Sequence, residues 1–310
     1  MINERSNAMH KIKHKVIIPV FIILFLMLVG AAHGQNPATA TTTINVDLAS
    51  FVANQYVHKY YPGFQWLNVD HMTLHDINGY VQAYAFVFAV SGSDFHSSDD
   101  LRRHIQEKSA ILVQAKEEQA SADQEAESVK QARVRVIDAE EALYNFRTFA
   151  TIITGATSDN KLILRHFRGI PEFWVSAETP NESTTLEQSG TSQQVTHIVM
   201  ITPMDFRLVV TESGGAKPLS TTMRSSQRTT FSNTAQILGT RASKVRSVAE
   251  MRKKRQAIVN RKQQRFNTLE PAERARYEKA LQDRAKAMAD KWQLYREMQT
   301  SYQKGKEVAK

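Results

Sequence analysis

The amino-acid sequence predicts an α+β fold, with an antiparallel sheet packed by a helix, a long helical insertion and a C-terminal basic helical extension. Between residues 72 and 213, short apolar segments alternate with turn residues, which indicates strands. Residues 99–146 contain neither glycine nor proline and are rich in strong helix formers. After about residue 240 the chain has a helical composition and a large excess of positive charge.

The first 34 residues have the pattern of a secretory signal peptide. A positively charged segment precedes an apolar run at residues 16–30, and the small residues Ala32 and Gly34 follow it. We expect cleavage near Gly34 and a secreted or periplasmic protein. The alternative is an uncleaved, N-terminally membrane-anchored chain, although the run is short for a span of about 20 residues. Residues 35–44 form a polar linker.

An α+β module is expected at residues 45–215. Its first element is a helix that Asp47 caps and that Pro62 and Gly63 terminate, with apolar residues at helical spacing between them. We expect this amphipathic helix to pack on the sheet.

A hairpin follows, because residues 72–77 and 80–90 flank Asn78-Gly79, the strongest two-residue hairpin signal. This turn places Leu74 opposite Ala83 and Met72 opposite Ala85. Both faces of the second strand are then apolar. We therefore expect that strand in the centre of the sheet or under a helix, as scaffold.

Residues 99–146 interrupt the module with a coiled-coil-like ladder of apolar residues. One continuous helix of this length would extend about 70 Å. A hairpin of two helices that breaks near Ser121 fits the sequence equally well. Either form would project from the sheet, and Ser97, Ser98 and Asp99 are the candidate N-caps.

Further strands are expected after the insertion. They lie at residues 149–157, 162–167, 172–177, 195–203 and 206–213, with turns at Gly169–Pro171 and Pro203–Asp205. Residues 178–194 are a polar linker within the module. Residues 216–240 form a Ser/Thr-rich linker to the tail.

The tail, residues 241–310, is basic and helical. It holds 20 Lys and Arg against 8 Asp and Glu, whereas residues 35–240 have a net charge of −6. Clustered cations bind polyanions by releasing counterions, and behind a signal peptide we expect an anionic membrane or envelope polymer rather than nucleic acid. The competing interpretation is that the tail pairs with the acidic body of the same chain. The candidate polyanion-binding residues are Arg252, Lys253, Lys254, Arg255, Arg261, Lys262 and Arg265.

A second tail helix is expected to begin at Pro271. Its apolar stripe runs from Leu281 through Trp292 to Tyr302 and requires a partner, which is another helix, the body or a second subunit. The helical segments therefore also suggest a homo-oligomer.

Several classes of chemistry are excluded or disfavoured. The chain has no cysteine, which excludes disulfides, thiolate metal sites and a cysteine nucleophile. It lacks Gly-x-Ser-x-Gly, a phosphate-binding glycine loop and His-Glu-x-x-His, so we expect no enzyme and no cofactor. His71 and His75 lie four apart on a strand and are weak metal-ligand candidates. Ordinary half-exposed strand histidines are the favoured interpretation, and no metal is expected.

Three segments, at residues 76–88, 149–173 and 196–215, resemble the inhibitor/pro-domain module of the streptopain-type cysteine peptidases, without the peptidase domain. In that module a helix packs on an antiparallel sheet, and an Asn-Gly or Asp-Gly turn precedes Ala-Tyr and an aromatic strand. The matching turn and core positions are Asn78, Gly79, Ala83, Tyr84, Ala156, Leu164, Gly169 and Pro171. The usual Gly-aromatic lead into the second strand is replaced by Arg147-Thr148-Phe149. The resemblance implies a secreted protein that binds a protein partner, such as a peptidase.

Two functions therefore remain open. The chain is either a non-enzymatic binding module of this inhibitor type, or a structural envelope scaffold that attaches through its basic tail.

Overall fold

The computed structural model describes residues 42–122, 126–179, 193–212, 224, 227–231, 235–239 and 246–308. The described residues form an α+β protein around one eight-stranded sheet, which confirms the expected fold class. The strands are β1 (Trp66–His75), β2 (Val81–Val90), β3 (Phe149–Gly155), β4 (Ile163–Arg168), β5 (Gln193–Thr202), β6 (Asp205–Glu212), β7 (Gln236–Gly239) and β8 (Arg246–Ser247). Their order is β4-β3-β2-β1-β5-β6-β7-β8, and every neighbouring pair is antiparallel except β1 and β5. The expected signal peptide, the start of the first linker and most of the two later linkers lie outside the described residues.

The β1–β2 hairpin has the expected register at Met72 and Leu74, and a register shift after Leu74 then places His75 opposite Val81. Leu74 faces Ala83 and Met72 faces Ala85. β2 lies between β1 and β3, and its side chains from Ala83 to Ala89 are buried on both faces. The hairpin is therefore central scaffold, as the apolar pattern on both faces predicts.

One face of the central strands is covered by α2 (Val46–Tyr60), which packs apolar side chains on Tyr84 and Phe88 of β2. The side chain of Asn45 caps this helix by accepting from the Leu48 N–H at 2.8 Å. The expectation that Asp47 is the cap is wrong. An N-cap needs a non-helical backbone, which Asn45 has, whereas Asp47 already lies in the first helical turn.

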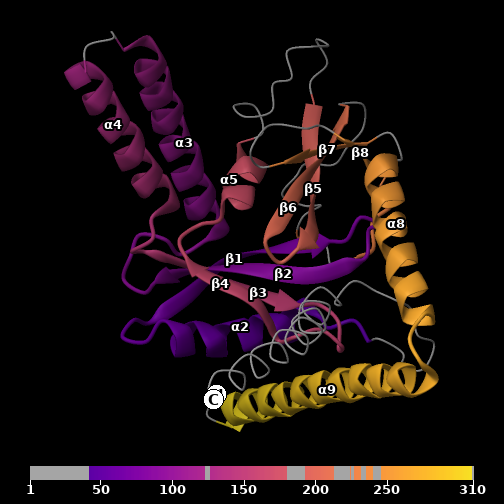
Figure 1. Cartoon of the computed structure of the whole chain (residues 1–310). Helices are drawn as coiled ribbons and strands as arrows, with labels where there is room; N and C mark the ends of the chain where they lie inside the picture. The colour runs from indigo at the N-terminus through magenta and orange to yellow at the C-terminus, as the bar shows by residue number, and fades with distance from the viewer. Residues whose placement is uncertain are drawn as a thin grey trace, which may run out of the picture. The chain divides into compact units, whose positions relative to one another are not determined.

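The opposite face carries α3 (Ser98–Ser121) and α4 (Ala126–Tyr144), which pack against each other. The insertion is therefore a helical hairpin that breaks where Ser121 was expected to end the first helix, and it extends away from the sheet (Figure 1). Ser97 is the N-cap of α3 and forms a capping box with Asp100.

The segment expected as a strand at residues 172–177 is instead the helix α5 (Glu172–Glu178). Pro171 precedes it, and its carbonyl accepts the N–H of Trp174 at 2.9 Å. Phe173 stacks on Phe206 of β6, with ring centroids 4.3 Å apart. Almost every residue of this short segment is buried, so its apolar run lacks a period that distinguishes helix from strand.

The sheet continues past residue 215. β7 pairs with β6, where Val209 faces Ile237, and it falls inside the segment expected as a Ser/Thr-rich linker. β7 has only four residues, which is too short for an alternating pattern to be visible in the sequence. β8 then leads into the basic helix α8 (Val248–Asn267).

The last helix, α9 (Pro271–Val308), begins at the expected proline and docks on the body. Trp292 is 1% exposed, and its indole N–H donates to the Asn160 carbonyl at 3.0 Å. Tyr295 lies against Tyr56 of α2, with ring centroids 6.1 Å apart. The body is therefore the partner of the second half of the apolar stripe, among the three partners considered for it.

Candidate functional site

The Asn78-Gly79 turn is a docking point for a distant part of the chain. The carboxylate of Asp76 accepts the N–H groups of Asn78 and Tyr80, at 2.8 and 3.0 Å, and shapes the turn. Gly79 has a φ of +83°, and a Cβ there would lie 1.6 Å from the Thr229 carbonyl oxygen. The Thr229 N–H also donates to the Gly79 carbonyl at 2.9 Å. Only glycine satisfies both the turn and this close approach.

We call residues 227–231 the strap, because this segment crosses the end of the hairpin. Its Arg228 guanidinium lies 4.0 Å from the centre of the Tyr80 ring. Its Gln227 carbonyl lies 3.3 Å from Nε2 of His75. The Phe231 ring is buried at its far end. The strap therefore contacts β1 and the turn between β1 and β2.

Beneath the strap lie two neighbouring buried histidines, His75 of β1 and His197 of β5, which we call the histidine pair. Their ring centroids are 5.3 Å apart in an edge-on arrangement. Each ring also contacts Phe231, at centroid distances of 6.2 Å for His75 and 5.3 Å for His197. Among the described residues, neither buried Nδ1 atom has a hydrogen-bond partner.

This environment favours the neutral form of both rings. Burial lowers the pKa of His75, while the Gln227 carbonyl and Asp76 partly oppose the shift. Burial, with the neighbouring His75 as a second cause, lowers the pKa of His197 to about 4. The pair is therefore uncharged at neutral pH, and a proton on the His197 ring would be buried without a compensating partner.

α8 is held at this same corner by two of its arginines. Arg252 donates from Nε to the Ile77 carbonyl at 3.2 Å and from Nη2 to the Phe231 carbonyl at 3.5 Å. Arg255 pairs with the buried Asp76 carboxylate at 3.6 Å. Two of the seven candidate polyanion-binding residues therefore anchor the helix to the hairpin and the strap.

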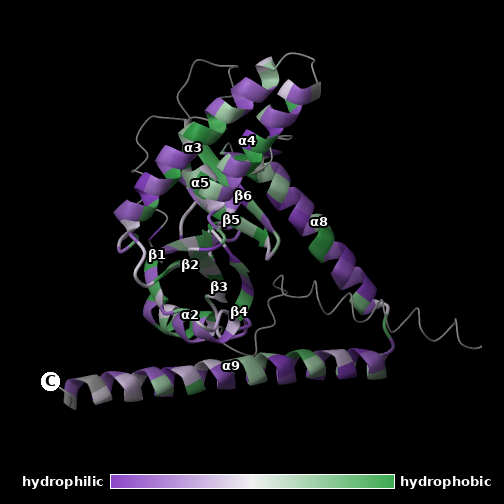
Figure 2. Ribbon diagram, turned by 90° about the vertical axis from the view of Figure 1, so that its left-hand side faces the viewer, coloured by the Kyte–Doolittle hydropathy of each residue, from purple (hydrophilic) through white to green (hydrophobic). Residues whose placement is uncertain are grey.

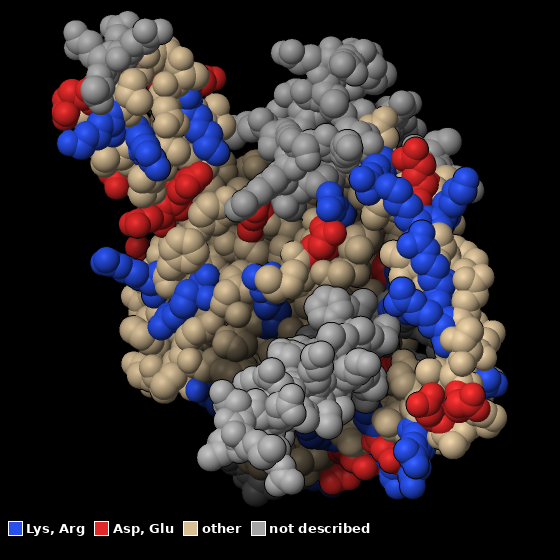
Figure 3. Space-filling view, in the orientation of Figure 1, with Lys and Arg blue, Asp and Glu red and all other residues tan. Residues whose placement is uncertain are grey.

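The cations farther along α8 have a different environment. We call Lys253, Lys254, Arg261 and Arg265 the basic face. All four are exposed, and none makes an ion pair with another described residue. Lys and Arg line α8 as a continuous blue band in Figure 3, and hydrophilic colours dominate the same helix in Figure 2. Lys262, the seventh candidate, is half-buried.

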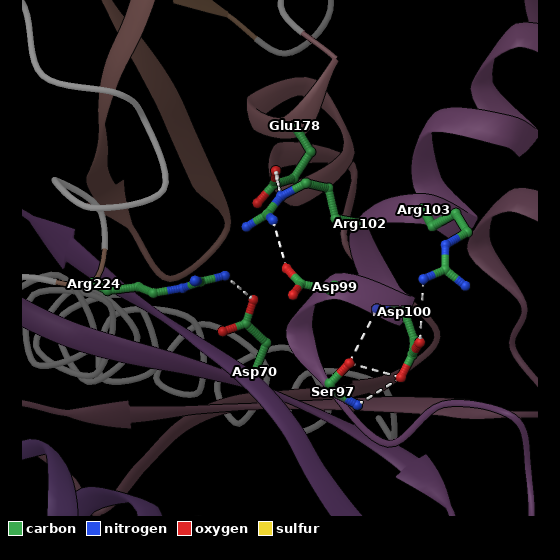
Figure 4. Close-up of polar contacts among 8 residues, drawn as sticks. All are labelled: Asp70, Ser97, Asp99, Asp100, Arg102, Arg103, Glu178 and Arg224. Carbon is green, nitrogen blue, oxygen red and sulfur yellow. Dashed lines mark hydrogen bonds and ion pairs between the residues drawn. The ribbon is translucent and has the colours of Figure 1, made fainter.

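A second group of charged side chains lies near β1, α3 and α5 (Figure 4). Asp70 is buried, pairs with Arg224 at 2.6 Å and accepts the His71 N–H at 2.8 Å. Burial nevertheless raises the pKa of Asp70, because the loss of hydration outweighs these favourable contacts.

The same group joins α3 to α5. Arg102 of α3 contacts Glu178 of α5 at 3.2 Å and Asp99 at 2.8 Å. Burial raises the pKa of Glu178, and Arg102 opposes the shift. Each buried carboxylate is thus engaged by an arginine. The arrangement is suited to cross-linking secondary structure, since neither carboxylate is presented to an incoming group.

The two metal-ligand candidates have separate surroundings. The expectation that both are half-exposed is wrong for His75, which is buried under the strap. His71 lies against Phe86, with ring centroids 6.0 Å apart, whereas the ring partner of His75 is His197. The described residues contain no group of three or more His, Asp or Glu side chains placed to hold a metal ion. Sequence reasoning missed His197, although a histidine inside the apolar run of residues 195–201 is a signal of a buried side chain.

The remaining family-pattern residues occupy core and turn positions. Tyr84 is buried and donates its hydroxyl to the Ile44 carbonyl at 3.0 Å, and burial raises its pKa to about 12. Ala83 of β2 and Ala156, which directly follows β3, are both fully buried.

The last three of these residues lie around β4 and α5. Leu164 is half-buried on β4. Gly169 has a φ of +90°, and a Cβ there would lie 2.8 Å from the Tyr144 carbonyl oxygen. Pro171 caps α5. Leu164 therefore contributes to packing, and Gly169 and Pro171 determine how the chain turns from β4 into α5.

No protein family, curated protein or solved structure matches the chain. The streptopain-type resemblance therefore stays a prediction. Within the described part of the chain, no helix is both long enough and apolar enough to cross a lipid bilayer.

Proposed function

We propose that this chain is a non-enzymatic binding protein of the cell envelope, secreted or periplasmic, that attaches to a polyanionic surface through α8. The observation that supports this most directly is the basic face. α8 has seven Lys and Arg against one Glu, and its four basic-face cations are exposed and make no ion pair with another described residue. Neutralisation by the chain's own acidic body, the competing interpretation, would require many more such pairs.

The spacing of the basic face suits a flat anionic surface. Lys254, Arg261 and Arg265 recur at intervals of seven and four, which places them on one side of a helix about 30 Å long. Ile258 lies on the same side and is 53% exposed. Each cation near an anionic surface contributes about 1 kcal/mol, and an exposed aliphatic side chain between cations can enter a lipid headgroup layer.

Charge reversal on the basic face tests the proposal. The variant Lys254→Glu/Arg261→Glu/Arg265→Glu should bind vesicles rich in phosphatidylglycerol at least about 100-fold more weakly than the unmodified chain. It should also have a smaller salt dependence, because fewer counterions are released. Equal binding by the two proteins in a flotation assay would reject the proposal.

The matched control reverses the same number of exposed cations on α9, as Lys279→Glu/Lys286→Glu/Lys291→Glu. This control should retain most of the binding, because those residues lie outside the basic face. Binding to a soluble polyphosphate, measured beside binding to vesicles, distinguishes an anionic polymer from an anionic membrane as the partner. Ile258→Ser should weaken binding to vesicles only, since the polymer offers no apolar layer.

A second candidate is binding to a peptidase through the α+β body. It is favoured by the Asn78-Gly79 hairpin and by α2, which packs on the sheet in the arrangement that the family resemblance implies. The test is inhibition of papain and of a streptopain-type peptidase by the purified chain. Unchanged hydrolysis of a fluorogenic peptide at high molar excess would reject this candidate.

A further inference from the structure

We propose that the histidine pair is an acid-sensitive latch, which holds the strap and the N-terminal part of α8 on the sheet at neutral pH and releases them on acidification. The inference rests on the proposed function only in treating α8 as the binding element. The latch itself is a property of the contacts among β1, β5, the strap and α8.

The first step is a series of contacts that links the histidine pair to α8. His75 and His197 contact the strap through Gln227 and Phe231. The Phe231 carbonyl then accepts Nη2 of Arg252 of α8. Displacement of the strap therefore removes one of the contacts that hold α8.

The second step is the response of the pair to protons. A neutral ring is tolerated between Phe231 and the apolar residues around it, such as Val199 and Val209. A protonated ring brings a buried charge beside a second imidazole at a centroid distance of 5.3 Å. The lowest-energy response is to hydrate the ring, which requires the strap to move.

The surrounding charges do not compensate a proton. The charged groups on the adjoining elements are Asp76, Arg207 with its partner Asp205, Arg228, Arg252 and Arg255. Asp76 is the one carboxylate that raises the pKa of His75, and it is already engaged by Arg255 and by two N–H groups of the turn. The cations would repel an imidazolium.

The sign of the effect follows from the lowered pKa. With the latch closed the pKa of His197 is about 4, and with the latch open it returns to the ordinary value of 6.5. The histidine pair therefore stabilises the closed state fully above about pH 6.5, and this stabilisation decreases as the pH falls toward 4. For His197 alone, the ratio of open to closed protein should rise about 70-fold between about pH 7.5 and about pH 4.5.

The consequence concerns the binding helix. Opening releases Arg252 and Arg255 from the Ile77 carbonyl and from Asp76. Both cations then become available beside the basic face. Acidification should thus expose more of the cationic surface of α8 in addition to protonating the histidines.

The absence of cysteine allows a direct test on the full chain. Spin labels on Ala257→Cys of α8 and Asp159→Cys of the β3–β4 loop, both exposed positions, report the distance between α8 and the sheet. The distance distribution should be narrow at about pH 7.5 and broad at about pH 4.5, while circular dichroism verifies that the fold remains intact. An unchanged distribution over this range would overturn the proposal.

Variants separate the latch from general acid effects. His197→Phe should keep the distribution narrow at low pH. His104→Gln is the matched control, because His104 is also buried with a lowered pKa but lies on α3, against Phe95 and Phe149. It should broaden like the unmodified chain. Equal broadening in His197→Phe would also overturn the proposal.

Arg252→Gln/Arg255→Gln provides a second route if His197→Phe fails to fold. This variant removes the helix anchor directly, so it should show the broad distribution already at neutral pH. A narrow distribution at both pH values would reject the latch. None of these readouts involves a polyanion, and vesicle binding at neutral pH tests the proposed function separately.

Discussion

Removal of the Trp292 side chain should detach α9 from the body. The indole is buried against the α2 side of the sheet and donates to the Asn160 carbonyl at 3.0 Å. A buried tryptophan removes about 150–250 Å² from water, roughly 4–6 kcal/mol as an upper estimate, and its hydrogen bond adds about 1 kcal/mol. Measured truncations of this type cost about 3–5 kcal/mol. We expect Trp292→Ala to fall in that range.

Hydrogen exchange of α9 measures this loss locally. A cost of about 3–5 kcal/mol corresponds to exchange that is about 100- to 5,000-fold faster in the peptide around Trp292, with β2 little changed. Trp292→Phe keeps most of the apolar contact but leaves the Asn160 carbonyl without its donor, so about 1–2 kcal/mol should be lost. Leu294→Ala is the control, because Leu294 is 54% exposed on the same helix and should have little effect. If Trp292→Ala left α9 exchange unchanged, the assignment of Trp292 as the anchor would be refuted.

Three further predictions concern the body, and each is measured by urea denaturation. Gly79→Ala should destabilise the fold more than Gly63→Ala, because both positions have positive φ but only a Cβ at the first meets the strap; equal losses would argue against the strap contact. Tyr84→Phe should cost about 1–2 kcal/mol by removing a buried hydrogen bond, and an unchanged midpoint would mean that the bond contributes nothing. Arg224→Gln should lower the free energy of unfolding more than Asp70→Asn, because it leaves the buried Asp70 carboxylate without its cation; a larger loss for Asp70→Asn would contradict stabilisation of this carboxylate by Arg224.

Local sequence signals predicted those elements whose geometry depends on neighbouring residues. Asn78-Gly79 predicts the hairpin, since glycine readily adopts the positive φ that Gly79 has in this turn. Pro271 predicts the start of α9 for a similarly local reason. The α5 segment escaped prediction, because burial on all sides leaves no periodicity.

The candidate site was predictable only in part. The excess of cations on α8 is a property of composition and is visible in the sequence. The division of those cations into anchors, Arg252 and Arg255, and an exposed basic face is not, because it depends on where Ile77, Asp76 and Phe231 lie in space.

The sequence by itself determined the α+β class, the central hairpin, the helical character of the insertion and the basic character of the tail. These follow from periods of two and 3.6 residues, from turn chemistry and from charge, which act over a few neighbouring positions. Only the tertiary structure decided that His75 meets His197, that the strap covers Gly79 and that Trp292 docks α9. Those contacts join segments more than 100 residues apart, and the pairing of β1 with β5 and the packing of the helices on the sheet bring them together.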